Sequence, residues 1–198
     1  MTRHLVIFAR APQFGRVKRR LASEIGSTAA TRFYRLTLGR QIRLMARDRR
    51  WTVWLFVTPD KALRHPAWQN IARVQGQGAG DLGQRMKQPF RLLPPGPIVL
   101  VGSDIPAMTP RHIARAFALL GHHDFVFGPA SDGGYWLIGA RRMRPLPRLL
   151  FDKVRWSTAH ALADTLATIP EEHAVGMADT LDDVDDARDL ERLTARTA

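Results

Sequence analysis

The chain has 198 residues, of which 45% are hydrophobic and 24% are charged, and its formal net charge is +12. This length can bury the core of one domain, and the composition is that of a globular chain and not of a disordered one. Because cysteine is absent, disulfides, thiolate metal sites and a cysteine nucleophile are excluded. No apolar run approaches the roughly 18–20 residues of a membrane span, and the N-terminal apolar run is too short for a signal peptide, so we expect a soluble cytoplasmic protein.

Short apolar runs alternate along the chain with longer segments of helical pattern. Strands are predicted at residues 5–8, 51–57, 71–74, 98–101, 125–127 and 135–138, with a further short one at Val175. Helices are predicted within 15–25 and at 27–48, 84–93, 109–120, 157–166 and 186–193. Ser27 is expected to cap the second helix, and Thr109 followed by Pro110 is typical of a helix start.

This alternation predicts an α/β fold in which a mostly parallel central sheet carries helices on both faces, a three-layer α/β/α arrangement. Repeats, low-complexity tracts and linkers are lacking in the sequence, so we expect a single domain over residues 1–198. In open α/β sheets, ligands bind beyond the carboxyl ends of the strands. The residues that follow each predicted strand are therefore the candidates for function.

The loop after the first strand is strongly basic. Five cations fall between Arg10 and Arg20, and the loop, which contains Gly15, leads into a helix. Backbone N–H groups at a helix start, together with Lys18 and the neighbouring arginines, would favour a phosphate or pyrophosphate ligand. The alternative is a solvated basic helix. The GxxxxGK[ST] spacing of a Walker loop is missing.

A glycine-rich loop, residues 76–83, follows the third strand. Its glycines at 78, 80 and 83 satisfy the GxGxxG pattern of dinucleotide sites, and Asp104 follows at about the expected distance. A Rossmann domain usually carries this turn after its first strand, where this chain has the basic loop. We therefore favour a glycine loop that lets the backbone approach some other ligand.

Carboxylates follow two further strands. Asp104 comes directly after the fourth strand, in the sequence VGSDIP, where its oxygens would suit Mg²⁺ or Mn²⁺ held together with substrate phosphates. The alternative is a turn aspartate. Asp132 lies in GPASDGG, which is either a hairpin turn or a sugar or acceptor pocket in which Asp132 acts as a base or as a ligand of a hydroxyl group.

Four of the five residues from 182 to 186 are acidic in this otherwise basic chain. A helix N-terminus accounts for Asp186 and Asp189, since acidic residues are preferred in a first turn. It does not account for the whole cluster, because packed carboxylates repel one another unless a cation offsets them. A second metal carboxylate is the other interpretation.

Six motifs occur in an order that resembles the bacterial glycosyltransferase-like family known as domain of unknown function 2064, of the nucleotide-diphospho-sugar transferase superfamily with the glycosyltransferase A fold. The resemblance covers nearly the whole chain and is carried by FARAPQFGRVKRRLA, GDLGQRM, VGSDIP, GPASDGGYWLIG, RWST and DDVDDARDL. The chain departs from the usual pattern in reading KRRL for KTRL and DVDD for DVDT. The second departure leaves Asp183 and Asp185 as alternatives for one role.

The resemblance implies roles for particular residues. The metal ligands would be Asp104 and Asp185. Those implied to act in catalysis are Asp104, Asp132 and Lys18. Those implied to bind the nucleotide are Ala9, Arg10, Gly15, Lys18, Arg20, Gly80, Asp81, Gly83 and Arg85. Those implied to face the acceptor or the transferred sugar are Asp132, Gly133, Gly134 and Tyr135.

The leading hypothesis is a metal-dependent transferase, a glycosyltransferase that uses a nucleotide-diphospho-sugar donor, Mg²⁺ or Mn²⁺ and an unidentified acceptor. A nucleotidyltransferase that releases pyrophosphate from a nucleoside triphosphate would use the same loops. The +12 charge motivates a third hypothesis, a non-catalytic nucleotide- or nucleic-acid-binding module. We do not favour nucleic acid, since neither a zinc pattern nor an aromatic–glycine RNA-binding signature is present. Exposed aromatic residues would be compatible with a homodimer.

Overall fold

The structure, a computed structural model, describes residues 1–68 and 73–195. The strands are β1 (His4–Arg10), β2 (Thr52–Thr58), β3 (Val74–Gly76), β4 (Ile98–Gly102), β5 (Phe125–Pro129), β6 (Tyr135–Ala140) and β7 (Val175–Met177). The α-helices are α1 (Arg19–Ile25), α2 (Ser27–Ala46), α3 (Leu82–Leu92), α4 (Pro110–Leu119), α5 (Ala161–Ala167) and α6 (Ala187–Ala195), and two short 3₁₀ turns lie at Asp60–Ala62 and Pro66–Trp68. Within the described residues, no helix is both long and apolar enough to cross a membrane.

The seven strands form one sheet in the order β3-β2-β1-β4-β6-β5-β7. The pairs β1–β2, β1–β4, β2–β3 and β5–β7 are parallel, whereas β6 runs antiparallel to both of its neighbours, so the expected mostly parallel sheet is confirmed. The chain moves outward from β1 through β2 to β3, and β4 then lies on the other side of β1. The carboxyl ends of β1 and β4 therefore flank the point where the strand order reverses, which is where open α/β sheets bind ligands.

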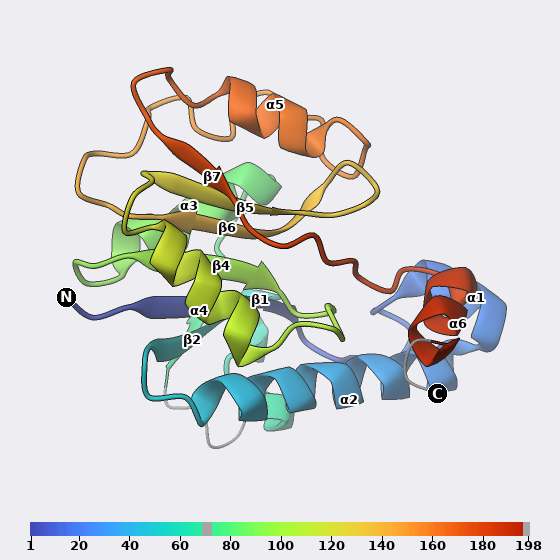
Figure 1. Cartoon of the computed structure of the whole chain (residues 1–198). Coiled ribbons are helices and arrows are strands. Elements are labelled where there is room, and N and C mark those ends of the chain that lie inside the picture. The colour runs from blue at the N-terminus through green and yellow to red at the C-terminus, as the bar shows by residue number, and fades with distance from the viewer. Residues whose placement is uncertain (69–72, 196–198) are drawn as a thin grey trace.

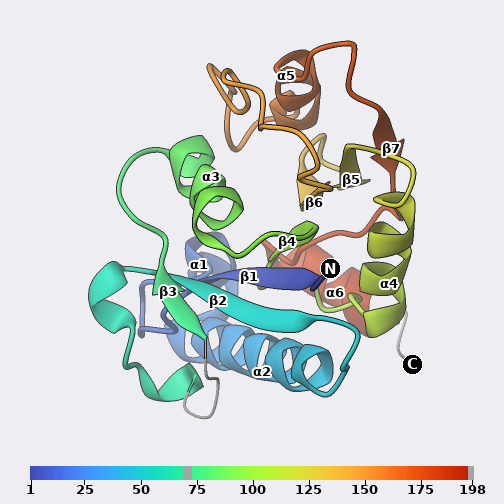
Figure 2. The ribbon, with the colours of Figure 1, turned by 90° about the vertical axis from the view of Figure 1, so that its left-hand side faces the viewer.

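Helices cover both faces of the sheet, as expected for three layers (Figures 1 and 2). Side chains alternate between the two faces of a strand, so Leu5 and Ile7 of β1 enter one core while Val6 enters the other. The first core contains α2 and α4, and the second contains α3 together with the partly buried side chains of α5.

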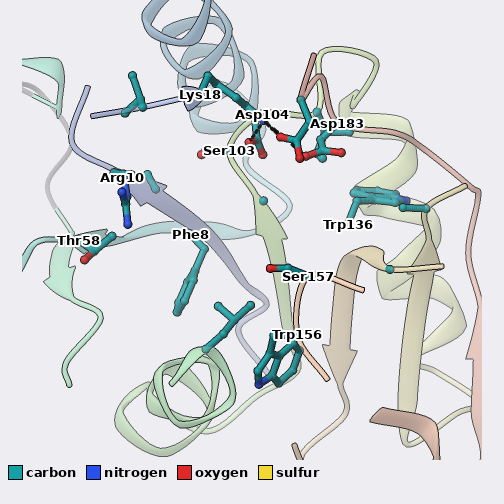
Figure 3. A pocket seen from close by; sticks show the side chains of 18 of the residues that line it. Phe8, Arg10, Lys18, Thr58, Ser103, Asp104, Trp136, Trp156, Ser157 and Asp183 are labelled. Carbon is teal, nitrogen blue, oxygen red and sulfur yellow. Dashed lines mark hydrogen bonds and ion pairs between the residues drawn. The ribbon is translucent and has the colours of Figure 1, made fainter. Parts of the chain in front are cut away.

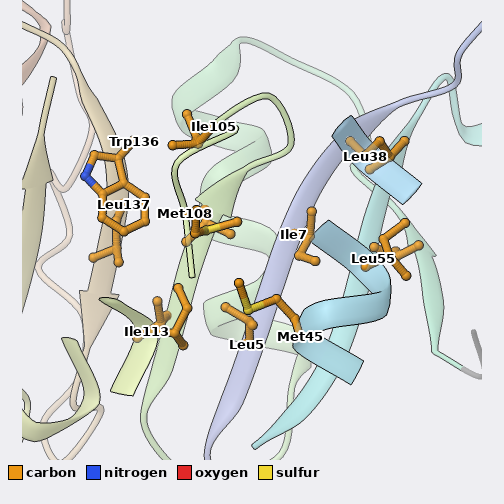
Figure 4. Close-up of a cluster of buried hydrophobic side chains, with 14 of the residues drawn as sticks. Leu5, Ile7, Leu38, Met45, Leu55, Ile105, Met108, Ile113, Trp136 and Leu137 are labelled. Atoms are coloured by element: carbon orange, nitrogen blue, oxygen red, sulfur yellow. The ribbon is translucent and has the colours of Figure 1, made fainter. Parts of the chain in front are cut away.

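The larger core packs α2 and α4 against the centre of the sheet (Figure 4). Leu38 and Met45 of α2 and Ile113 of α4 are at most 1% exposed, and they meet Leu5 and Leu55. Burying each such side chain contributes about 1.5–3 kcal/mol to stability. This packing holds α2 on one face of the sheet and places its Tyr34 beside Arg10, at the carboxyl end of β1 where the basic loop begins.

A third, smaller cluster joins the two ends of the chain. Leu21 of α1, Ala30 of α2 and Val184 are buried together, with Leu190 of α6 packed against them. Figure 1 shows α1 and α6 side by side, beyond the ends of the strands. The acidic segment that precedes α6 is thereby held against the basic loop, although most of the chain separates them in sequence.

Most predicted boundaries differ from those of the structure by one to three residues, and three differences have consequences for the loops. The third strand was predicted at residues 71–74 and lies at Val74–Gly76; Ile71 is outside the described residues. The helix predicted from Ser157 begins at Ala161, because Ser157 has a φ of 60°, which a right-handed helix cannot include. Ser27 is the first residue of α2 and not its cap, a position taken by Gly26 with a φ of 84°.

Candidate active site

The Lys18 side chain lies among three carboxylates beyond the ends of the strands (Figure 3). Its Nζ is 2.5 Å from an oxygen of Asp104, 2.7 Å from one of Asp185 and 3.5 Å from one of Asp183. The side chain of Lys18 is only 5% exposed, whereas those of the three aspartates are 26–46% exposed. The structure thus brings Lys18, Asp104 and Asp185 together, as their placement after successive elements predicted.

The backbone around each of these residues directs its side chain toward the others. Asp104 follows β4, and Lys18 directly precedes α1 with left-handed backbone angles, φ 46° and ψ 54°. A non-glycine residue in this region costs about 1–2 kcal/mol. Asp183 and Asp185 flank the buried Val184. Both carboxylates lie within 3.5 Å of Nζ of Lys18, and which of them is the second metal ligand stays a prediction.

Charge and burial shift the pKa values of these groups. Burial disfavours the ammonium of Lys18, but the charges of Asp104, Asp183 and Asp185 outweigh burial and raise its pKa above the ordinary value. Burial raises the pKa of Asp183 to about 7; Lys18 opposes this rise, and the other two carboxylates add to it. For Asp185, burial is outweighed by the charge and hydrogen bond of Lys18, and the pKa is lowered.

The three carboxylates fit a divalent cation in donor type and in charge. One oxygen from each of Asp104, Asp183 and Asp185 can be chosen so that all lie within 4.8 Å of one another. Oxygen donors are what Mg²⁺ and Mn²⁺ prefer. Three ionised carboxylates and one ammonium leave an excess of two negative charges, which one divalent ion would neutralise. In the protein alone, Lys18 supplies the positive charge between them.

The cluster forms one wall of a cleft of about 740 Å³. Several predicted site residues line it: Ala9, Arg10, Lys18, Arg20, Arg85, Asp104, Asp132, Gly134, Tyr135 and Asp185. Other predicted residues do not line it: Gly15, Gly80, Asp81, Gly83 and Gly133. Arg16 adds a further cation. In Figure 3, the charged cluster and the aromatic rings of Phe8 and Trp156 lie in different parts of the cleft, so it offers both charged and apolar walls.

A buried tyrosine connects the basic loop to the loop that carries Asp104. The hydroxyl of Tyr34 in α2 accepts the backbone N–H of Arg10 at 3.0 Å, donates to the Arg10 carbonyl at 2.9 Å, and lies 3.0 Å from Oγ of Ser103. Burial raises the pKa of Tyr34 to about 12, against the hydrogen bond from Ser103. The hydroxyl therefore stays protonated and positions the residues next to Asp104.

The glycine-rich loop is organised by the start of α3. Asp81 caps this helix by accepting the backbone N–H of Gln84, whose side chain accepts the N–H of Asp81 in return. A Cβ on Gly83 would lie 2.8 Å from Cβ of Phe151 and 3.0 Å from the Trp156 ring, so this glycine permits close packing. Asp81 and Gly83 thus have structural roles in this loop, and Arg85 is the predicted residue that reaches the cleft.

The loop GPASDGG is a hairpin turn that also borders the cleft. It joins β5 to β6, and Asp132 accepts the backbone N–H of Gly134 at 2.8 Å. Gly133 has a φ of 83°, and a Cβ there would collide with the backbone of Ala159. The hairpin interpretation is confirmed. Asp132 and Tyr135 line the cleft from the turn, and their role toward a sugar or acceptor stays a prediction.

The acidic segment divides between three roles. Asp182 accepts hydrogen bonds from the backbone and side chain of Ser131, which fixes the segment to the β5–β6 turn. Asp186 and Asp189 exchange hydrogen bonds at the start of α6, as expected for a helix N-terminus. Asp183 and Asp185 are left to face Lys18.

Sequence reasoning missed several residues of the cleft. Gln77 is buried, donates to the carbonyls of Phe56 and Ala9, and accepts from Arg85, so it links two strands to α3. Trp156 and Ser157 enter from the connection before α5. The motif RWST was the available signal for that segment, but nothing local to it indicates that it folds back over the cleft.

The start of α1 offers little to the anion site that was expected there. The helix α1 has only seven residues, and its N-cap makes no side-chain hydrogen bond. The groups that could hold an anion are therefore the cations that line the cleft, Arg10, Arg16, Lys18, Arg19, Arg20 and Arg85.

Comparison with solved structures identifies the fold. A candidate nucleotide-diphospho-sugar transferase from Desulfovibrio desulfuricans G20 is 30% identical, with a TM-score of 0.89 over 98% of this chain and 87% of that one. The inositol-1-phosphate CTP transferase from T. maritima is 14% identical, with a TM-score of 0.60 over 98% and 94% of the two chains. Glucosyl-3-phosphoglycerate synthase from Mycobacterium tuberculosis, solved with Mn²⁺ and UDP, is 13% identical, with a TM-score of 0.55 over 98% and 76%.

The glycosyltransferase A fold expected from the motifs is confirmed, and the structural neighbours include both glycosyl- and nucleotidyltransferases. No curated protein matches the chain. The sequence profile of one protein family, described as uncharacterised proteins conserved in bacteria, matches residues 41–158. The chain therefore belongs to the family DUF2064.

Proposed function

We propose that this protein is a metal-dependent transferase that moves a sugar from a nucleotide-diphospho-sugar to an acceptor hydroxyl. The observation that carries the proposal is the cluster of Lys18, Asp104, Asp183 and Asp185 at the wall of a cleft that is also lined by arginines. Carboxylates and cations side by side suit a diphosphate bound together with a divalent ion. The 30% identity to a candidate nucleotide-diphospho-sugar transferase supports the same class.

The metal ligands would be Asp104 and Asp185, with Asp183 as the third carboxylate within reach. A bound Mg²⁺ or Mn²⁺ would offset the negative charge that develops on the leaving diphosphate. Tyr34 would hold the loop that carries Asp104 in place through its hydrogen bond with Ser103 and its two hydrogen bonds with the backbone of Arg10.

The cations of the basic loop would bind the phosphates directly. Lys18 has three N–H donors, and its raised pKa keeps it charged at neutral pH. Arg10 and Arg20 face the same cleft and can each offer two parallel N–H groups to a phosphate. Charges fixed in advance around the leaving group lower the barrier without reorganisation during the reaction.

Asp132 is the residue proposed to take the proton of the acceptor. The acceptor oxygen would form a bond to the anomeric carbon, the bond from that carbon to the β-phosphate oxygen would break, and the nucleoside diphosphate would leave with the bonding electrons. The hydroxyl proton would pass to a carboxylate oxygen of Asp132, which lines the cleft. Tyr135 and Trp156 would contact the sugar ring through their apolar surfaces.

Nucleotidyl transfer is the second candidate, and the fold itself supports it, since the inositol-1-phosphate CTP transferase shares this architecture. In that reaction, the substrate oxygen would attack the α-phosphorus of a nucleoside triphosphate, and pyrophosphate would leave. The same cations would then hold the β- and γ-phosphates.

Product analysis separates these two reactions. Purified protein would be incubated with Mn²⁺ and either a panel of nucleotide-sugars or the nucleoside triphosphates, with sugar and sugar-phosphate acceptors. Glycosyl transfer predicts release of nucleoside diphosphate, and nucleotidyl transfer predicts release of pyrophosphate. Either activity should fall at least 100-fold in Asp104→Asn and remain in Asp152→Asn, an exposed carboxylate outside the cleft. Activity that persists in Asp104→Asn would reject the proposed site.

A further inference from the structure

The outer face of α2 carries a stripe of five arginines. Successive members lie three to five residues apart. They are Arg32, Arg35, Arg40, Arg43 and Arg47, of which the last directly follows the helix. All five are exposed. At 100° and 1.5 Å per residue, they occupy an arc of about 140° along roughly 22 Å of the helix. We call this surface the arginine stripe.

These charges are not balanced locally. The helix α2 contains neither aspartate nor glutamate, and none of the five arginines forms an ion pair or side-chain hydrogen bond with any residue that the structure describes. Other arginines of the chain do find partners, such as Arg155 with Asp164 and Arg115 with Asp179. Five neighbouring guanidinium groups repel one another, so an anionic surface placed against them would relieve that repulsion.

The stripe is rigid and separate from the candidate active site. The opposite face of α2 is buried in the larger core through Leu38, Ile42 and Met45, so the helix cannot roll to hide its arginines. Within the described chain, Tyr34 is the one residue of α2 that lines the cleft. The charge of the stripe therefore has no part in the chemistry proposed above.

The other residues of this face indicate which polyanion it fits. Leu36 lies within the stripe and is 60% exposed, so an apolar side chain stands among the cations. Exposed positions of α2 carry no aromatic ring that could stack on bases, and its one glutamine, Gln41, is fully buried. Cations around an apolar side chain match the headgroup layer of an anionic bilayer, where phosphates lie above acyl chains.

We propose that the arginine stripe docks this protein on anionic lipid membranes, with α2 lying parallel to the bilayer surface. Because the apolar face of α2 is committed to the core, the helix cannot insert, and binding is electrostatic, reversible and sensitive to salt. The helix α2 covers one face of the sheet and carries the stripe on its outer side, whereas the cleft lies beyond the strand ends, so the cleft stays open while the protein is docked.

Vesicle co-sedimentation tests the proposal. The full chain would be mixed with vesicles of phosphatidylcholine alone, or of phosphatidylcholine and phosphatidylglycerol in equal parts, at low and high salt. The test variant is Arg35→Gln/Arg40→Gln/Arg43→Gln. The control is Arg91→Gln/Arg148→Gln/Lys153→Gln, which removes the same charge from the α3 side, at exposed cations that form no ion pair with a described residue. A third variant, with lysine at positions 35, 40 and 43, retains the charge.

Binding is expected to the phosphatidylglycerol vesicles only and to disappear at high salt. Each removed arginine should weaken it about fivefold, so the test variant should lose on the order of 100-fold while the control and the lysine variant bind normally. Equal losses in the test and control variants would overturn the stripe as the docking surface, as would an absence of binding to anionic vesicles. Tighter binding to a DNA or RNA duplex, lost in the test variant alone, would assign the stripe to nucleic acid and overturn the membrane proposal.

Discussion

The ammonium of Lys18 lies 2.5 Å from a carboxylate oxygen of Asp104, so the loop after β1 and the loop after β4 meet at one charged contact. Asp183 and Asp185 complete the contact from the C-terminal segment. A cation already lies where the proposed metal would bind, so in the proposed function Lys18 would compete with the metal and would also bind phosphate. This double role makes the site accessible to simple binding experiments.

Substitution of Lys18 by methionine should change two affinities in opposite directions. Without the ammonium, the three carboxylates should bind Mn²⁺ alone about tenfold more tightly or better, because a charge at about 4 Å is worth several kcal/mol at an effective dielectric near 20. The affinity for a nucleoside diphosphate should fall at least tenfold, since a charge-assisted hydrogen bond is lost. Calorimetric titration measures both.

Lys153→Met is a matched control. Like Lys18, Lys153 has a left-handed backbone conformation, with a φ of 54°, but its side chain is exposed. It should leave both affinities unchanged. A parallel fall of both affinities in Lys18→Met would show that Lys18 only maintains the loop structure.

Gly83→Ala should destabilise the protein even in the absence of any ligand. Alanine normally stabilises a helix relative to glycine by about 1 kcal/mol. At position 83, however, the added Cβ would come within 3.0 Å of Phe151 and Trp156, and such overpacking costs about 1–3 kcal/mol. Gly39→Ala in α2, where the Cβ meets only the flexible end of Arg43, should stabilise instead. If urea unfolding shows Gly83→Ala to be as stable as the wild type, the close packing described here is wrong.

Tyr34→Phe should lower both stability and activity. It removes the hydroxyl that pairs with Arg10 and Ser103 and leaves buried polar groups without partners, at a cost of about 1–3 kcal/mol. A double-mutant cycle with Ser103→Ala measures the coupling, which should be at least about 0.5 kcal/mol. If the changes in the free energy of unfolding caused by the two substitutions were strictly additive, Tyr34 and Ser103 would act independently.

Acid should destabilise the protein partly through His4. This residue is 2% exposed and its Nδ1 accepts the indole N–H of Trp54, and burial lowers its pKa below the ordinary 6.5, with the charges of Arg142 and Arg73 acting in the same direction. Below pH 6.5, the unfolded chain binds the proton more tightly than the folded protein, so the free energy of unfolding should fall as the pH falls.

His4→Gln keeps an acceptor for Trp54 but cannot titrate. Its free energy of unfolding should therefore depend less on pH between 6.5 and 5 than that of the wild type, as measured by urea unfolding at several pH values. His122→Gln, at an exposed position, serves as the control. If the free energy of unfolding changed equally with pH in His4→Gln and in the wild type, the pKa of His4 would not be lowered by folding.

The sequence predicted the parts of this structure that depend on short-range signals. Hydrophobic runs located the strands, and their position before charged loops placed Arg10, Lys18 and Asp104 at one edge of the sheet. The sequence alone could not decide whether Asp183 or Asp185 lies at the site, because both residues are aspartates in the same segment. The folded chain shows that both lie beside Lys18, through the ion pairs that they form with it.

Other features depend on contacts between distant segments, which periodicity does not report. The glycine-rich loop predicted a close approach of backbone to a ligand, and the sequence did not indicate that Gly83 packs against Phe151. Tyr34 and Gln77 resemble ordinary helix and loop residues in the sequence, and only the folded chain brings their polar atoms to the backbone of Arg10 and Ala9.

Metal-dependent nucleotide binding tests the central claim most directly. A nucleoside diphosphate would be titrated calorimetrically into the wild type, Asp104→Asn and Asp152→Asn, with and without Mn²⁺. We predict that Mn²⁺ raises the affinity at least tenfold in the wild type and in Asp152→Asn, and does not raise it in Asp104→Asn. An undiminished effect of Mn²⁺ in Asp104→Asn would contradict the assignment of this carboxylate cluster to a metal-bridged diphosphate.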